Sequence, residues 1–175
     1  MRKQRALVVI LVALVTGVSS FAQQPSQGGK VARQLVGRWK LMSLEAVRPN
    51  GEVVREWGPN PTGYLSYDAS GFVSVQFMRD PRAAKQSREL TPDERGEAFE
   101  SYYAYYGRFE VDDKEGSVTH HIQGSLRPYE VGTDLKRFFK LSGDRLDLST
   151  PPQQLETGEP RVYRLSWELR HSQKR

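Results

Sequence analysis

Cysteine is absent from the 175-residue chain, and histidine is scarce, with three residues. The first absence excludes disulfide bonds, thiol catalysis and a lipid-modified cysteine. His120 and His121 are adjacent, and adjacent residues of a strand point to opposite faces. A shared metal ion would need convergent side chains and further ligands, so we expect no metal site. The chain also lacks the G-x-S-x-G pattern of hydrolases and a glycine-rich phosphate loop.

Long apolar runs are confined to residues 6–18, near the N-terminus. This run of 13 residues follows the basic segment MRKQR and precedes Ser20 and Ala22, as in a secretory signal peptide cleaved after Ala22. It is shorter than the ~20 residues that span a bilayer. We therefore expect residues 1–22 to be a signal peptide and the protein to be exported to the periplasm or the cell exterior. The mature chain is expected to have no membrane span.

The expected mature chain has little net charge. Loss of Arg2, Lys3 and Arg5 with the signal peptide would lower the formal charge from +5 to +2. Charges of both signs alternate along the chain, which does not give the basic surface of a nucleic-acid-binding domain. Residues 23–33 are polar and glycine-rich and are expected to form a flexible linker. Residues 34–171 are then expected to form one domain.

The expected domain consists mainly of short segments typical of antiparallel strands. The side chains of FVSVQFM, at residues 72–78, alternate between two faces of a strand. A tight hairpin is predicted over residues 135–150, where the turn GD joins the segments LKRFFKLS and RLDLST. About eight or nine such segments predict an all-β fold. A closed barrel is favoured over a sandwich because closure removes exposed strand edges.

One helix is expected in the middle of the chain, over residues 92–104. Thr91 is a suitable N-cap, Pro92 fits the first helical position, and Glu94 completes a capping box. Gly107 marks the end of the pattern. Helical spacing would place four aromatic residues on one stripe: Phe99, Tyr102, Tyr103 and Tyr106. We expect this helix to lie across one opening of the barrel.

Five segments, in this order, resemble the bacterial lipocalin-like domain family. They are LVGRWKLMSLEAVRPNGEVV, WGPNPTGYLSYDASGFVSVQFM, YYGRFEVDDKEGSVTHHIQGSLRP, RFFKLSGDRLDLSTPP and LSWELR. The resemblance implies a lipocalin-like antiparallel β-barrel of about eight strands, with the helix inserted mid-chain. Gly37-Arg38-Trp39 is similar to the G-x-W of lipocalins. There the tryptophan packs the closed end of the barrel and an arginine, here Arg170 or Arg164, covers its ring.

Alternation along each strand separates the side chains that face the barrel interior from those that face solvent. His120 shares the more apolar face of its strand with Val118 and Ile122, so we expect His120 to point inward and His121 outward. Arg137 lies on an otherwise apolar face. The candidate ligand-binding residues are Trp39, Tyr64, Gln76, Tyr106, His120, Arg137 and Trp167.

These residues describe an aromatic pocket with few polar groups, the usual composition of a small-molecule site. An eight-stranded barrel can hold one small ligand. The leading hypothesis is an exported barrel that binds a small apolar or amphipathic molecule without a cofactor. The alternative is a small cofactor-independent enzyme, a cyclase, isomerase or hydratase, that uses His120 and Arg137 near Glu110 or a tyrosine. A structural interpretation is also open, with His120 as a core residue and Arg137 paired to Glu110.

Overall fold

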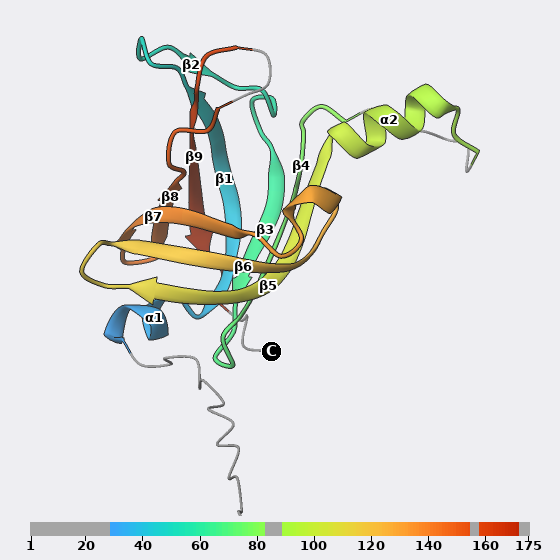
Figure 1. Ribbon diagram of the computed structural model, residues 1–175. Helices are drawn as coiled ribbons and strands as arrows, with labels where there is room; N and C mark the ends of the chain where they lie inside the picture. Colours follow the sequence, from blue (N-terminus) through green and yellow to red (C-terminus); the bar gives the residue numbers. More distant parts are fainter. Residues whose placement is uncertain (1–28, 83–88, 155–157, 172–175) are drawn as a thin grey trace, which may run out of the picture.

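A computed structural model describes residues 29–82, 89–154 and 158–171. Its strands form one antiparallel sheet in the order β2-β1-β3-β4-β5-β6-β7-β8-β9, and pairing of β1 with β9 closes the sheet into a barrel (Figure 1). The barrel has eight strands, and β2 is an additional short strand beside β1. The predicted fold class is therefore confirmed. The strands are β1 (Gly37–Val47), β2 (Val53–Val54), β3 (Thr62–Tyr67), β4 (Phe72–Met78), β5 (Tyr102–Asp112), β6 (Ser117–Ser125), β7 (Asp134–Ser142), β8 (Arg145–Ser149) and β9 (Val162–Leu169).

Strict alternation of burial shows how the sequence specifies each strand. In β4, Val73, Val75 and Phe77 are buried, whereas the four residues between and beside them are exposed. The turn before β4 is fixed by Asp68, whose carboxylate accepts hydrogen bonds from the backbone N–H groups of Ser70 and Phe72. The buried faces of successive strands join in one hydrophobic core inside the barrel.

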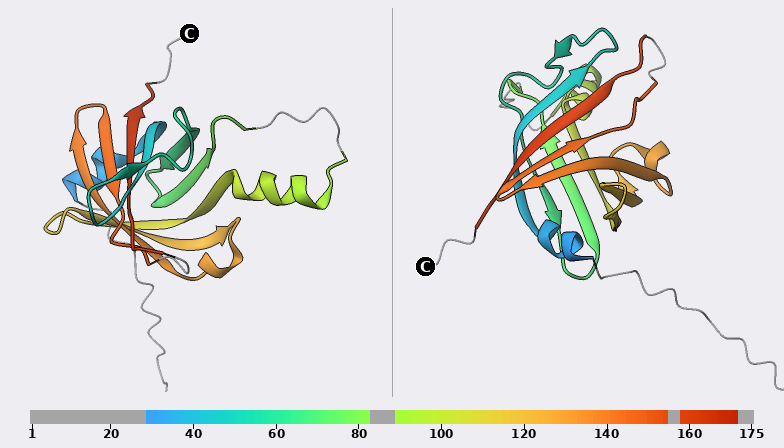
Figure 2. Two further views of the ribbon diagram at one scale, coloured as in Figure 1. Left: turned by 90° about the horizontal axis from the view of Figure 1, so that it is seen from above. Right: turned by 90° about the vertical axis from the view of Figure 1, so that its left-hand side faces the viewer.

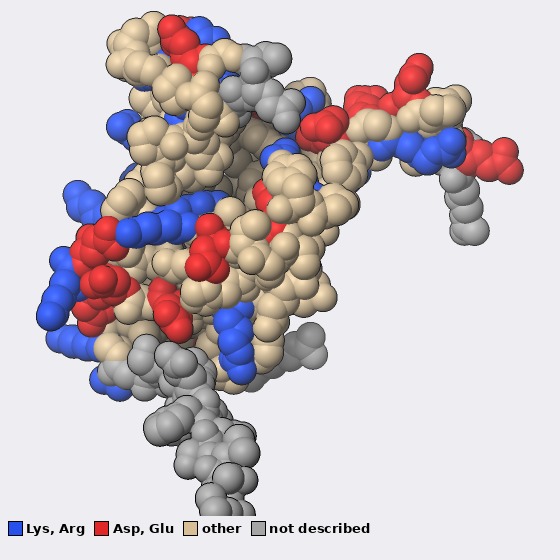
Figure 3. Space-filling view, viewed as in Figure 1, with Lys and Arg blue, Asp and Glu red and all other residues tan. Residues whose placement is uncertain are grey.

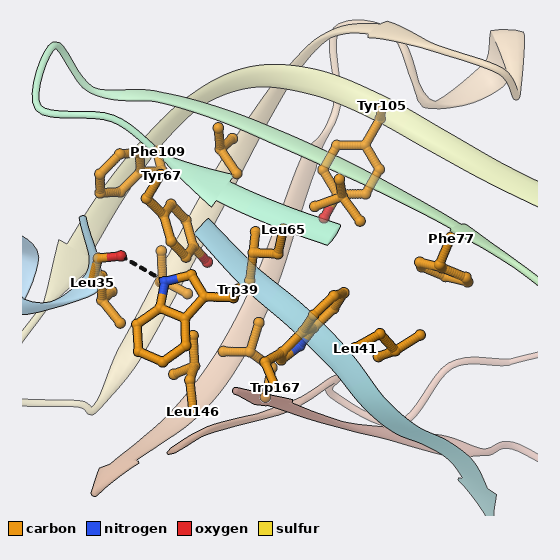
Figure 4. Packing of buried hydrophobic residues seen from close by; sticks show 14 of the residues in the cluster. Leu35, Trp39, Leu41, Leu65, Tyr67, Phe77, Tyr105, Phe109, Leu146 and Trp167 are labelled. Atoms are coloured by element: carbon orange, nitrogen blue, oxygen red, sulfur yellow. Dashed lines mark hydrogen bonds between the residues drawn. The ribbon is translucent and has the colours of Figure 1, made fainter. Parts of the chain in front are cut away.

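A short helix, α1 (Lys30–Leu35), closes one end of the barrel. Leu35 and Trp39 are fully buried, and the indole Nε1–H of Trp39 donates to the Leu35 carbonyl at 2.8 Å (Figure 4). Trp39 thus packs the closed end, as the resemblance implies. Residues 30–33 of the expected linker begin this helix, and residues 23–28 lie outside the described part of the chain.

No cation–π contact in the described part of the chain involves Trp39, so the expected arginine cover is wrong. The Arg170 guanidinium instead lies 3.6 Å from the Glu168 carboxylate, and Arg164 is exposed. The physical reason is that α1 already covers this end of the barrel. The Leu35 carbonyl accepts the hydrogen bond from the indole N–H of Trp39, the polar group of that ring.

The mid-chain helix, α2 (Pro92–Glu100), is shorter than predicted. Its start is confirmed, because Thr91 and Glu94 form the reciprocal hydrogen bonds of a capping box. Its predicted end is wrong, because β5 begins at Tyr102 and pairs with both β4 and β6. Strand pairing satisfies the backbone and buries Tyr103 and Tyr105 on one face, which a continued helix would not do.

Helix α2 does not lie across the barrel opening. It extends away from the barrel beyond the end of β4 and the start of β5 (Figures 1 and 2). None of its residues is buried. The expected covering role is therefore wrong, and the barrel opening is bordered by strands and by the 3-10 helix η1 (Pro128–Glu130). The described helices are all too short or too polar to cross a membrane.

Candidate ligand-binding site

The polar centre of the barrel interior is a histidine held between two tyrosines. His120 on β6 is 1% exposed. Its Nε2 lies 2.7 Å from the hydroxyl of Tyr67 at the end of β3, and its Nδ1 lies 2.7 Å from the hydroxyl of Tyr105 on β5. Both tyrosines are buried. Three strands therefore bring one imidazole and two phenols into a continuous hydrogen-bonded chain.

This chain of three residues is uncharged at neutral pH. Burial, followed by the positive charges of Arg137 and His121, holds the pKa of His120 well below its usual value. Burial raises the pKa of Tyr67 well above its usual value and raises that of Tyr105 to about 12, although Arg137 opposes the latter effect. A neutral imidazole has one donor and one acceptor nitrogen. One tyrosine thus donates to His120, and the other accepts from it and keeps its own hydroxyl proton for a further partner.

Arg137 places a positive charge beside this chain. It lies on β7 opposite Val118, one strand away from His120, and is 9% exposed. One of its guanidinium nitrogens donates to the Lys136 carbonyl at 2.8 Å. The Glu110 carboxylate, its expected partner, is exposed and lies 3.7 Å from Nε2 of His121 on the outer face. The predicted pairing of Arg137 with Glu110 is therefore wrong.

A second polar cluster lies at the same side of the barrel, around Glu130 of η1. The Glu130 carboxylate is buried and accepts hydrogen bonds from the hydroxyls of Tyr103, at 2.9 and 3.0 Å, and Ser125, at 2.7 Å. The Arg127 guanidinium lies 5.0 Å from the centre of the Tyr103 ring. Tyr103 and Tyr105 have ring centres 5.5 Å apart, so the two clusters are contiguous through their aromatic rings.

Comparison with known proteins identifies the family. Residues 36–169 match the lipocalin-like domain family. The chain belongs to this family. It is also 31% identical over 104 residues to the 4'-hydroxy-3'-methoxypropiophenone carrier protein ppsC of Aspergillus oryzae, a match that covers 54% of this chain and 94% of that protein. Membership of the lipocalin-like family and a relative named as a carrier favour small-molecule binding over the enzymatic alternative.

The lipocalin-like barrel places four of the seven predicted site residues in its interior. Trp39, His120, Arg137 and Trp167 are buried and face inward, as expected. Contact of these four with a ligand stays a prediction. His121 faces outward and bonds to Asp134, as the alternation predicts.

The other three predicted site residues lie on the outside of the lipocalin-like barrel, so their inward placement was wrong. Tyr64 is 37% exposed, with the Arg38 guanidinium 4.7 Å from its ring centre. Gln76 lies opposite Tyr64 across β3 and β4 and is exposed with it, because Val75 and Phe77 take the buried face. Tyr106 is 57% exposed because Tyr105 takes the interior position.

The barrel surface carries one hollow and two recesses, and neither recess is lined by Tyr67, Tyr105, His120 or Arg137. Figure 3 shows the surface hollowed between the side that carries β2 and the side that carries η1 and α2. A recess of about 390 Å³ also opens between α1 and β7 and is lined by Val31, Gln34, Phe139, Leu141 and Gly143. Phe139 and Leu141 follow Arg137 on the inward face of β7. A second recess of about 390 Å³ lies largely on the outer face of β7, β8, β9 and β1 and includes Arg164.

The strand alternation could have identified Tyr103 and Tyr105 if residues 102–106 had been interpreted as a strand. Tyr67 shares a face with Leu65 in its strand and follows the same rule. Glu130 had no such signal, because it lies in the short 3-10 helix η1, whose position is set by contacts with β5 and β6. Among the described residues, no group of three or more His, Cys, Asp or Glu side chains could hold a metal ion.

Proposed function

We propose that this protein is a carrier that binds a small aromatic, amphipathic molecule inside its barrel. The observation that carries the proposal is the buried chain of Tyr67, His120 and Tyr105 beside Arg137. A few convergent polar groups in an otherwise aromatic interior orient a ligand, while the rings supply contact area. The name of the fungal relative supports an aromatic ligand, since a propiophenone is a phenyl ketone.

The interior offers both kinds of contact that such a ligand needs. The rings of Phe77, Tyr103 and Tyr105 follow one another at centre distances of 5.1 and 5.5 Å. Aromatic pairs at these distances favour edge-to-face or offset contacts, which a planar ligand can join. The free hydroxyl proton of Tyr105 or Tyr67 can then donate to a ligand oxygen. The hollow in Figure 3 supports entry from the side of β2 and η1.

Titration of the purified protein with hydroxyphenyl ketones, phenols and fatty acids tests this function. We expect at least one aromatic class to bind with a dissociation constant of roughly a micromolar or lower by calorimetry. His120→Phe should weaken this binding about tenfold, because it removes the hydrogen bonds that hold both tyrosine hydroxyls in place. His121→Phe is the matched control on the outer face and should leave the affinity unchanged. Equal affinities of the two variants, or no binding across the panel, would reject the proposal.

We also propose that the carrier is exported. The basic segment, the apolar run at residues 6–18 and the small residues Ser20 and Ala22 support this proposal. Expression of the full chain in its native host should yield a protein whose N-terminal residue is Gln23. Intact-mass measurement of the purified protein and cell fractionation check the cleavage and the location. A cytoplasmic product that retains residues 1–22 would contradict the proposal.

A further inference from the structure

The buried cation Arg137 has no acidic partner of its own. No ion pair in the described part of the chain involves Arg137. Its neighbours include the Lys136 carbonyl, which is neutral, and the Tyr105 and His120 side chains, which are uncharged at neutral pH. Removal of a cation from water is costly unless an anion or several hydrogen bonds offset it.

Four carboxylates on the neighbouring elements bond to groups other than Arg137. Asp134 and Glu110 lie on the outer face beside His121. Glu115 pairs with the Lys136 ammonium group and accepts from Ser117. The Glu130 carboxylate is held by Tyr103 and Ser125 and forms no ion pair with Arg137. None of these carboxylates forms an ion pair with the Arg137 guanidinium.

Hydrogen-bond donors outnumber acceptors in this part of the interior. Arg137 has five N–H donors, of which one bonds to the Lys136 carbonyl and another to the Tyr105 hydroxyl oxygen, so the others remain for a ligand. The Tyr105 hydroxyl has a proton free for a further partner whenever Nδ1 of His120 carries the ring proton. An interior with surplus donors and a buried cation that forms no ion pair is complementary to a group with several negatively charged oxygens.

We infer that the ligand of this carrier is an aromatic acid in its ionised form, with its anionic oxygens bound by Arg137 and Tyr105. This inference rests on the proposed function and specifies the class of ligand. The planar guanidinium can bind two oxygens of a carboxylate or sulfonate at once, and the Tyr105 hydroxyl donates to one of them. The aromatic rings of Tyr103, Tyr105 and Phe77 contact the apolar part of the ligand.

A matched pair of fluorescent probes tests the inference. Anilinonaphthalene sulfonate is anionic, and N-phenylnaphthylamine has the same ring system without the sulfonate. Burial of apolar surface alone favours the neutral probe, because it has no charged group to desolvate. We expect the wild-type protein to bind the sulfonate at least about tenfold more tightly, since a charge-assisted, bidentate contact adds to ring burial.

Arg137→Met should weaken sulfonate binding by about 10- to 100-fold while it changes binding of the neutral probe less than about threefold. The matched control is Arg164→Met, which removes an exposed arginine beside the outer recess and should change neither affinity. Arg137→Lys, which keeps the charge and loses the planar fork, should give an intermediate affinity for the sulfonate.

Thermal unfolding without any probe separates ligand binding from a structural role. If Arg137 serves to bind an anionic ligand and does not stabilise the unliganded fold, Arg137→Met should unfold at the same or a higher temperature than the wild type. The reason is that the substitution removes a buried charge that forms no ion pair. A marked loss of stability or a failure to fold would assign Arg137 a structural role and overturn the inference. A wild-type preference for the neutral probe would overturn it independently of any variant.

The remaining outcomes are also decisive. An equal loss of affinity for both probes in Arg137→Met would reject an anion site at Arg137, and so would a loss of affinity for the sulfonate in Arg164→Met. Neither result would contradict the carrier role. Failure of both probes and of the whole ligand panel to bind would instead reject the carrier role itself.

Discussion

Replacement of Trp39 with alanine is expected to lower the free energy of unfolding by about 3–5 kcal/mol, the usual cost of removing a large buried aromatic side chain. Trp39 is fully buried at the closed end of the barrel, between α1 and the strands. Its loss leaves a cavity and also leaves the Leu35 carbonyl without the Nε1–H that it accepts. The end of α1 therefore loses both its packing surface and its hydrogen-bonded anchor.

Chemical denaturation monitored by circular dichroism measures this effect, and two comparisons make it specific. Tyr129→Ala removes an aromatic side chain that is 72% exposed and should change stability by less than about 0.5 kcal/mol. Trp39→Phe should cost more than Trp167→Phe, because the indole N–H of Trp39 has an acceptor and that of Trp167 has none. Equal costs for the two phenylalanine variants would contradict the role of the Leu35 bond.

The closed end of the barrel illustrates what the sequence alone could specify. The burial of Trp39 follows from its place on the apolar face of a strand, and its position at the barrel floor followed from the G-x-W resemblance. The α1 cover did not follow, because KVARQL has neither a side-chain N-cap nor an acidic first turn. Six residues are too few to be helical on local preference alone. Docking of Leu35 against the barrel decides the conformation of this segment.

Residues 99–106 show why an aromatic segment can satisfy two periodicities. Phe99, Tyr102, Tyr103 and Tyr106 fit a helical stripe, whereas Tyr103, Tyr105 and Phe109 fit one face of a strand. The capping box at Thr91 is a local signal, and the start of α2 that it predicts is confirmed. The choice beyond Ser101 depends on pairing with β4 and β6, whose residues are distant in the sequence. The interior tyrosines were missed for this reason.

The candidate site shows the same limit more strongly. Alternation correctly placed His120 and Arg137 inside the barrel, because each lies among apolar residues on its own strand. Tyr64 and Gln76 were both predicted to point inward but point outward. They are paired across β3 and β4 and therefore lie on the same face of the sheet, so a single wrong assignment of that face accounts for both. The partners of His120 could not be deduced from its strand, because Tyr67 is 53 residues away in the sequence. Only the closed barrel brings the two side chains together.

Acidification is expected to destabilise the fold through His120. The folded-state pKa of this imidazole is held well below its usual value, first by burial and then by the charges of Arg137 and His121. In the unfolded chain the pKa is about 6.5. Between these two values the unfolded state binds a proton that the folded state does not. Stability therefore rises with pH in this window and is lost as the pH falls below about 6.5.

The free energy of unfolding of the wild type should therefore decline steadily as the pH falls below about 6.5. His120→Gln removes the titrating group and keeps an amide that can bond to Tyr67 or Tyr105. Its free energy of unfolding should therefore decline less steeply than that of the wild type between pH 6.5 and 5, although its stability at neutral pH is lower. Denaturant titrations at a series of pH values measure both slopes.

Ile122→Val is the matched control, because Ile122 is buried on the same face of β6 two residues beyond His120. The variant lowers stability by about 0.5–1.5 kcal/mol without removing a titrating group. It should therefore keep the wild-type slope. If His120→Gln and Ile122→Val show the same pH dependence, the proton is taken up elsewhere, and the neutral imidazole between Tyr67 and Tyr105 does not control acid stability. A shallower slope in His120→Gln alone assigns the uptake to this buried hydrogen-bonded chain, the same group that the proposed carrier function requires to be neutral and fixed.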